Sequence, residues 1–223
     1  MSVKFFDAIR AGNKEAVERF LLLDSGLIHA AEKGLSPVLV AAYHLEPHLA
    51  EYLADKKVTL DIFEASAIGR TTHIIRILAR QPELVNVFAD DGFQPLGLAC
   101  FFGHLEAADY LVKAGASVNT PSNNPIGATP LQSAVAGNHV SIVKALLKNG
   151  AHPNVHEGAG FTPLHTAARN GNAEIVQLLI LSGADLHAQT GDGKIALDLA
   201  REKGQSQAVE ILKREITKRF RRP

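Results

Sequence analysis

The stretch Gly160-Phe-Thr-Pro-Leu-His-Thr-Ala-Ala-Arg-Asn-Gly171 decides the fold of this chain. Thr162 and Pro163 are typical of a helix start, because a hydroxyl caps free backbone N–H groups and proline has none to satisfy. Gly171 ends the helix, since glycine adopts a left-handed turn at little cost. Apolar residues at helical spacing predict a second helix over residues 174–180. Two helices this short bury little surface alone, so the unit needs neighbours.

The same pattern returns when the sequence is shifted by about 33 residues. The earlier copies read Gly127-Ala-Thr-Pro-Leu-Gln-Ser-Ala-Val-Ala-Gly-Asn138, Gly92-Phe-Gln-Pro-Leu-Gly-Leu-Ala-Cys-Phe-Phe-Gly103 and Gly34-Leu-Ser-Pro-Val-Leu-Val-Ala-Ala42. The chain resembles the ankyrin repeat family over nearly its whole length. Residues 162–168 match the family hallmark Thr-Pro-Leu-His-x-Ala-Ala at every fixed position. It looks like a short, stand-alone, prokaryotic member.

The resemblance implies an all-α solenoid, a single domain over residues 1–223 with about seven helix-turn-helix repeats, β-hairpin fingers and a cap at each end. The expected repeats cover residues 2–29, 30–54, 58–86, 87–119, 120–152, 153–185 and 186–223. The third repeat is degenerate. Pro37 and Asp61 take equivalent places only about 24 residues apart, short of the family period of about 33. We therefore expect no full finger between repeats two and three.

Composition limits the class of protein. The 223 residues carry 23 basic and 23 acidic side chains, so there is no overall electrostatic reason to expect nucleic acid or an anionic membrane. The single cysteine excludes an internal disulfide and favours a reducing compartment. No stretch approaches the roughly 20 apolar residues of a membrane span. We expect a cytoplasmic protein that binds neither nucleic acid nor membrane.

The residues with chemical potential favour structural roles. In the family, the motif histidine, here His165, makes structural hydrogen bonds between neighbouring loops. The same slot in the other repeats holds Phe6, Leu39, Phe63, Gly97, Gln132 and Asp198. His152 and His156 are four residues apart, but Pro153 between them favours a loop over a metal-binding helix. Cys100 takes an alanine slot and is interpreted as a small buried residue. We predict no catalytic residue, no metal and no cofactor.

The candidate binding surface follows from the family resemblance. In ankyrin repeats, the finger residue after the glycine and the two residues before the helix-ending glycine face the concave side, where partners commonly dock. With two aspartates as a polar rim, the predicted partner-binding residues are Tyr43, His44, Ile68, Asp90, Asp91, Phe93, Phe101, Phe102, Phe161 and Arg169. A cluster of phenylalanines in these slots indicates an interaction surface. The other interpretation is that they pack locally as core, because the nearby finger is absent.

The favoured function is therefore a non-catalytic protein–protein interaction module that binds another protein in the concave groove. The alternative is a small-molecule-binding protein or enzyme that uses the same groove, and it would need a cluster of titratable groups. We expect a monomer, and a homodimer through the aromatic patch stays open. The basic C-terminus is either a solvated helix end or a docking tail; its residues are Arg214, Lys218, Arg219, Arg221 and Arg222.

Overall fold

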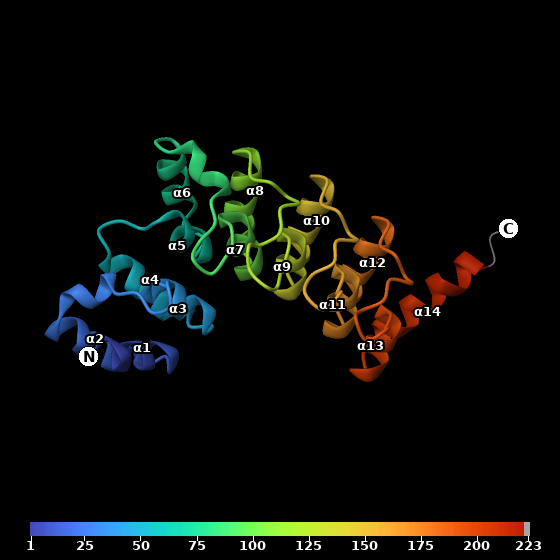
Figure 1. The fold of residues 1–223 in the computed structure, drawn as a ribbon, viewed down its shortest axis with the longest axis horizontal. Coiled ribbons are helices and arrows are strands. Elements are labelled where there is room, and N and C mark those ends of the chain that lie inside the picture. Colours follow the sequence, from blue (N-terminus) through green and yellow to red (C-terminus); the bar gives the residue numbers. More distant parts are fainter. Residues whose placement is uncertain (221–223) are drawn as a thin grey trace. The chain divides into compact units, whose positions relative to one another are not determined.

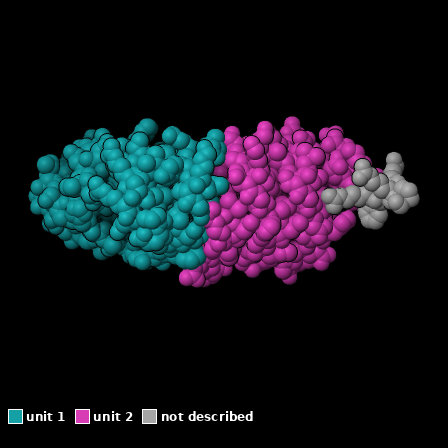
Figure 2. Space-filling model, turned by 90° about the horizontal axis from the view of Figure 1, so that it is seen from above, with its two compact units in different colours: residues 1–115 teal, residues 116–223 magenta. Residues whose placement is uncertain are grey.

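The structure, a computed structural model, describes residues 1–220, with side chains described as far as Lys218. Arg221, Arg222 and the side chain of Arg219, all in the predicted basic tail, lie outside the described residues. Within residues 1–220 the chain forms fourteen α-helices and two 3-10 helices (Figure 1). It divides into two compact units, unit 1 over residues 1–115 and unit 2 over residues 116–223 (Figure 2).

Unit 1 consists of four successive helix pairs. Its helices are α1 (Ser2–Arg10), α2 (Lys14–Leu23), the 3-10 helix η1 (Ser25–His29), α3 (Pro37–Tyr43), α4 (Pro47–Lys56), α5 (Ile62–Ala67), α6 (Thr71–Leu78), the 3-10 helix η2 (Pro82–Asn86), α7 (Pro95–Phe102) and α8 (Leu105–Lys113). The first helices of the pairs, α1, α3, α5 and α7, pack on one another in succession. We call them the inner helices, and their partners the outer helices.

Unit 2 repeats this arrangement with three pairs. They are α9 (Pro130–Ala136) with α10 (Val140–Lys148), α11 (Pro163–Asn170) with α12 (Ala173–Leu181), and α13 (Ala196–Glu202) with α14 (Ser206–Phe220). Within unit 2 the inner helices α9, α11 and α13 form one layer and the outer helices α10, α12 and α14 a second (Figure 1). The predicted all-α class is confirmed. Among the described residues, only two isolated antiparallel bridges occur, Glu32–Leu35 and Glu157–Phe161, and no strand. The β-hairpin fingers therefore stay a prediction.

In four inner helices a polar side chain of the first turn accepts a hydrogen bond from the backbone N–H of the residue that caps the helix. These bonds are Asp61 N to Glu64 Oε2 (3.1 Å), Thr129 N to Gln132 Oε1 (2.9 Å), Thr162 N to His165 Nδ1 (3.1 Å) and Ile195 N to Asp198 Oδ2 (3.2 Å). Burial lowers the pKa of His165, which keeps its imidazole neutral. The other ring nitrogen, Nε2, then donates to the carbonyl oxygen of Lys194 in the next loop (3.1 Å). The predicted structural role of His165 is confirmed.

The third helix pair keeps this capping bond but differs in the residue that makes it. Spacing from Gly69 assigns the slot to Phe63, and this assignment is wrong: the capping contacts place Glu64 there, because α5 is shorter at its start. The Glu64 side chain is 0% exposed, and its Oε1 lies 2.6 Å from Nζ of Lys57, whose side chain is 11% exposed. Lys57 belongs to residues 57–61, which alone connect α4 to α5. A buried ion pair thus stands where a regular repeat has a long loop.

One turn between paired helices is also irregular. The residue that ends the inner helix adopts a left-handed backbone, and it is Gly103 (φ 89°), Gly171 (φ 78°) or Asn138 (φ 65°) in three pairs. In the second pair it is Leu45, with φ 59°. Leucine disfavours this conformation because its Cβ approaches the following carbonyl oxygen. The backbone at Leu45 is therefore strained.

The neighbours of two other turns explain why the side chain of Leu45 finds room. The side chain that begins the next outer helix lies against the turn glycine: Glu46 against Gly12 and His104 against Gly69. For the turn at Leu45, the side chain that begins the outer helix of the next pair is Arg70, at the start of α6. It turns away and pairs instead with two carboxylates of α4, Glu51 (Nε to Oε2, 2.9 Å) and Asp55 (2.8 Å). Leu45 is left uncovered.

Replacing Lys57 by methionine tests the buried ion pair. The Glu64 carboxylate would stay buried without its cation, so we expect the free energy of unfolding to fall by about 3 kcal/mol. Because the three tyrosines (residues 43, 52 and 110) all lie in unit 1 and the chain has no tryptophan, tyrosine fluorescence in urea follows this unit. The double variant Lys57→Met/Glu64→Gln should recover most of the loss, because glutamine serves in this slot at position 132. A single variant as stable as wild type would contradict the proposed role.

Replacing Leu45 by asparagine tests the strained turn. Asparagine tolerates the left-handed backbone, so we expect this variant to be more stable than wild type by about 1 kcal/mol. The matched control is Leu22→Asn, which makes the same change at an exposed leucine within α2 and should destabilise slightly through lower helix propensity. Equal effects of the two substitutions in urea unfolding would show that the turn at Leu45 stores no strain.

Candidate functional site

The structure separates the ten predicted partner-binding residues between the two units. Phe161 and Arg169 belong to unit 2, and the other eight belong to unit 1. Within unit 1 the residues come from three helix pairs: α3 and its turn, the end of α5, and the loop and helix around α7. Unit 1 is therefore where the sequence-predicted residues gather, and its contacts define the candidate site.

Three aromatic side chains of unit 1 form one cluster. The ring centroids of Tyr43 and Phe102 lie 5.4 Å apart, and those of Phe101 and Phe102 lie 5.1 Å apart in an edge-to-face arrangement. All three side chains are half-buried. The Tyr43 hydroxyl donates a hydrogen bond of 2.6 Å to Oδ2 of Asp91. We call Tyr43, Phe101, Phe102 and Asp91 the aromatic cluster. The burial of its rings lies between the two interpretations of the sequence, an open patch and a local core.

The cluster joins helix pairs that are not neighbours in the chain. Tyr43 lies at the end of α3 in the second pair, whereas Asp91 lies in the loop before α7 of the fourth pair. The Asp90 side chain also lies directly against Gly34, in the loop before α3. The connection before α5 consists only of residues 57–61. The loop before α3, which carries Gly34, and the loop before α7, which carries Asp90, therefore have no third loop between them. The short connection therefore brings the second and fourth pairs into contact.

The electrostatics of the cluster favour structure over reactivity. Burial raises the pKa of Tyr43 far above its usual range, and the hydrogen bond to Asp91 adds to this shift. The phenol therefore stays protonated and acts as a donor at physiological pH. The second carboxylate oxygen of Asp91, Oδ1, accepts from the backbone N–H of Phe93 at 3.1 Å. Oδ2 of Asp91 thus ties the loop to α3, and Oδ1 holds the local shape of the loop.

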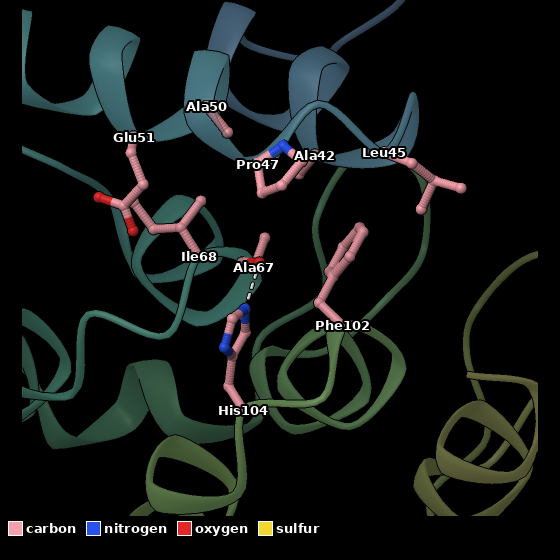
Figure 3. A pocket seen from close by; sticks show the side chains of 9 residues that line it. All are labelled: Ala42, Leu45, Pro47, Ala50, Glu51, Ala67, Ile68, Phe102 and His104. Carbon is pink, nitrogen blue, oxygen red and sulfur yellow. Dashed lines mark hydrogen bonds between the residues drawn. The ribbon is translucent and has the colours of Figure 1, made fainter. Parts of the chain in front are cut away.

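Next to the cluster lies an apolar pocket of about 280 Å³ (Figure 3). We call it the Leu45 pocket; its lining residues are Ala42, Leu45, Pro47, Ala50, Glu51, Ala67, Ile68, Phe102 and His104. The ring of Phe102 and the side chain of Ile68 point toward Pro47 and Ala50 across the space (Figure 3). His104 Nε2 lies 2.9 Å from the carbonyl oxygen of Ala67 and holds one wall. The pocket therefore lies where the second, third and fourth helix pairs meet.

Leu45 lies at the rim of this pocket and combines two unfavourable features. Its backbone is left-handed, and its side chain is 77% exposed. The exposed side chain contributes little to packing. The left-handed backbone would suit a glycine or an asparagine better than a leucine. Sequence reasoning missed Leu45. The available signal was that leucine follows Tyr43 and His44 where the equivalent positions hold glycine or asparagine.

The remaining predicted residues of unit 1 take different places. Ile68 is only 8% exposed and forms part of the pocket floor, so it is not an open surface residue. His44 is exposed and lines a separate hollow with Arg10 and Glu32. Phe93 is half-buried, and within the described residues its ring makes no contact with another aromatic ring. Asp90 is exposed at the loop tip.

Phe161 and Arg169 form their own contact in unit 2. The guanidinium carbon of Arg169 lies 5.3 Å from the centroid of the Phe161 ring, a cation–π geometry. The Phe161 ring also meets the His165 ring edge-to-face at 5.8 Å. Burial raises the pKa of nearby Glu157, and the positive charge of Arg169 opposes this shift. The two predicted residues are thus brought together, apart from the aromatic cluster.

The residues with chemical potential remain scattered. Cys100 is fully buried, and burial raises the pKa of its thiol well above the usual range, which disfavours the thiolate. His152 and His156 are both exposed in the loop before α11. Among the described residues, no group of three or more His, Cys, Asp or Glu side chains could hold a metal ion. Over the same residues, no helix has the length and apolar character to cross a bilayer.

Comparison with known proteins agrees with this architecture. A family model described as "Ankyrin repeats (3 copies)" matches residues 62–157, 120–190 and 151–220. Ankyrin repeat protein nuc-2 of Neurospora crassa is 31% identical over 162 residues, which cover 66% of this chain and 15% of that protein. Ankyrin repeat domain-containing protein 63 is 29% identical over 148 residues in mouse and in human, covering 65% of this chain and 32% or 33% of that protein.

The chain thus spans a third or less of the length of these curated relatives, and the likeness concerns their repeats. The family model covers most of the region from α5 to α14, well over half of the chain. Together with the succession of paired helices, this match shows that the chain belongs to the ankyrin repeat family.

Proposed function

We propose that the protein recognises another protein by burying an apolar side chain of its partner in the Leu45 pocket. Ankyrin repeats are generally protein-interaction modules, and a protein-binding role is consistent with the family. The observation that carries the specific proposal is Leu45, a strained and 77% exposed leucine at the rim of an apolar pocket. Strain that serves no packing purpose is typical of functional positions.

The size of the pocket favours a side chain over a free small molecule. Pockets that bind small ligands usually measure about 300–1,000 Å³ and carry several convergent polar groups. The Leu45 pocket measures about 280 Å³, and its polar lining residues, Glu51 and His104, are engaged with Arg70 and with the carbonyl of Ala67. One or two apolar side chains of a protein would fill it, as an anchor residue fills a hot-spot pocket.

The aromatic cluster supports the pocket rather than forming the whole contact surface. Phe102 belongs to both, and its ring is held from behind by Phe101 and Tyr43. The hydrogen bond from Tyr43 to Asp91 fixes this arrangement. We therefore assign the direct apolar contact to Leu45 and Phe102, with His44 and Asp90 as exposed polar residues nearby in unit 1.

The same proposal includes the wider organisation expected from the sequence. We infer that each helix pair is one repeat, which makes seven repeats in one domain over residues 1–223, with capping first and last repeats. The protein would act without catalysis, as a cytoplasmic monomer, with hairpin fingers between its repeats. Phe161 and Arg169 remain candidate contacts for a partner in unit 2.

The binding role of Leu45 is tested by a photo-reactive benzoylphenylalanine at position 45, in the host cell, with the same probe at position 22 as the control. Leu22 is 87% exposed and lies outside the pocket. We expect a protein adduct at position 45 alone. With that partner purified, Leu45→Asn should weaken binding by about 2 kcal/mol, the loss of a hot-spot residue, although the variant is more stable, and Leu22→Asn should bind like wild type.

The possible outcomes separate the candidate functions. An adduct with a small mass increment would favour the small-molecule alternative over a protein partner. A partner captured equally at positions 45 and 22, or bound equally by wild type and Leu45→Asn, would contradict the Leu45 pocket as the interface. Because Leu45→Asn is expected to be more stable than wild type, a loss of binding could not be attributed to unfolding.

A further inference from the structure

The outer helix α6 presents a face that its neighbours leave open. On one side α6 packs on the outer helix α8. On the other side runs the short connection between α4 and α5, and a hollow of about 660 Å³ lies between this connection and α6. In unit 2, by contrast, the outer helix α12 packs on both α10 and α14. The missing loop thus leaves one face of α6 uncovered.

Part of the lining of this hollow is apolar, and some of that apolar surface is exposed. Val58 and Leu60 of the connection and Ile77 of α6 contribute apolar surface. Val58 is 94% exposed, the most exposed of the large apolar side chains in the described residues. Such a position is unfavourable for an isolated protein and is typical of a contact surface when a polar rim surrounds it.

The rim of the hollow is basic. Arg76 and Arg80 line it and are exposed, and neither forms an ion pair with any residue that the structure describes. Two other arginines of unit 1, Arg10 and Arg70, are each paired with two carboxylates. No aspartate or glutamate lines the hollow within the described part of the chain. The positive charge at the rim is therefore uncompensated.

A third polar group faces the same region. His73 also lines the hollow, and its Nδ1 atom is buried without a hydrogen-bond partner in the described structure. A buried polar atom without a partner costs free energy, and a ligand that supplies a partner recovers it. His73 and Arg76 are three residues apart on α6, and Arg80 follows in the turn just after the helix; all three line the hollow.

We propose that this face of α6 binds an acidic amphipathic helix of a partner protein. Arg76 on α6 and Arg80 in the turn after it both line the hollow, so carboxylates along one side of a second helix can pair with both guanidinium groups. The apolar side of that helix covers Val58 and Ile77. The site shares no lining residue with the Leu45 pocket, and it goes beyond the function proposed for that pocket.

Charge and shape favour this occupant over other anions. Among the residues that line it, the hollow offers no Phe, Tyr or Trp ring on which a nucleic-acid base could stack. The whole chain is neutral by its formal charge, which disfavours long-range attraction of a polyanion. A small inorganic anion would neutralise the arginines but would leave Val58 and Ile77 exposed. An acidic helix with one apolar side satisfies both parts of the surface.

The probe for this proposal is a synthetic fluorescein-labelled helical peptide that carries glutamates four residues apart and a leucine stripe. Its control is the same peptide with every glutamate replaced by glutamine. In fluorescence anisotropy we expect the acidic peptide to bind wild-type protein at least about tenfold more tightly than its glutamine control. Arg76→Glu/Arg80→Glu should lose binding by about the same factor, because like charges then face each other. Addition of the acidic peptide should shift the ring nitrogen signals of His73 in NMR spectra.

Control variants separate specific binding from bulk charge. Arg19→Glu makes the same charge change at an exposed arginine of α2 and should bind the peptide like wild type. Val58→Ser, a change at a 94% exposed side chain, should weaken binding without altering the circular dichroism spectrum. Leu45→Asn should bind the peptide normally, so failure of this proposal is distinguishable from failure of the Leu45 pocket.

Three results would overturn the proposal. The first is equal binding of the acidic peptide and its glutamine control. The second is unchanged binding by Arg76→Glu/Arg80→Glu, or an equal loss in Arg19→Glu. The third is displacement of the peptide by inorganic phosphate beyond what chloride of equal ionic strength produces, which would identify a small-anion site instead.

Discussion

The buried carboxylate of Glu64 is the constraint on which the irregular half of this protein depends. In two other helix pairs the equivalent slot holds a neutral group, Gln132 or His165, which caps its own helix and also reaches the next loop. In the last pair it holds Asp198, whose side chain is 41% exposed. A carboxylate in that slot needs a cation, because an unpaired buried charge is very unfavourable. Lys57 supplies the cation from the short connection before α5, and the ion pair holds this connection against the helix.

The short connection has consequences on both sides of unit 1. On the inner side, the loop before α7 reaches the second helix pair, where Asp91 accepts from Tyr43 and Asp90 lies against Gly34. On the outer side, one face of α6 is left uncovered. Both candidate surfaces of the molecule therefore arise from one departure from the regular repeat. In the described part of unit 2, the middle outer helix α12 packs on both of its neighbours, α10 and α14.

In the proposed function, stability and recognition compete at Leu45. The turn would be satisfied by the asparagine found at position 138, and the leucine side chain is mostly exposed rather than packed. Arg70, which could have covered it, is bound to Glu51 and Asp55. The residue is thus unfavourable for the folded chain alone, and this cost is the observation from which its binding role is proposed.

The sequence by itself determined the helix pairs, because caps, turn glycines and apolar spacing are encoded within each repeat and need no distant contact. It also named Tyr43, Phe101 and Phe102 as candidates from their slots, and Asp91 as part of a polar rim. Only the tertiary structure decided that these four meet, since Tyr43 and Asp91 are 48 residues apart and their contact depends on a loop that is absent. The structure likewise decided the half-burial of the phenylalanines, the slot of Glu64 and the exposure of Leu45. Burial and pairing depend on which neighbours remain when one loop is missing, and no local pattern encodes that.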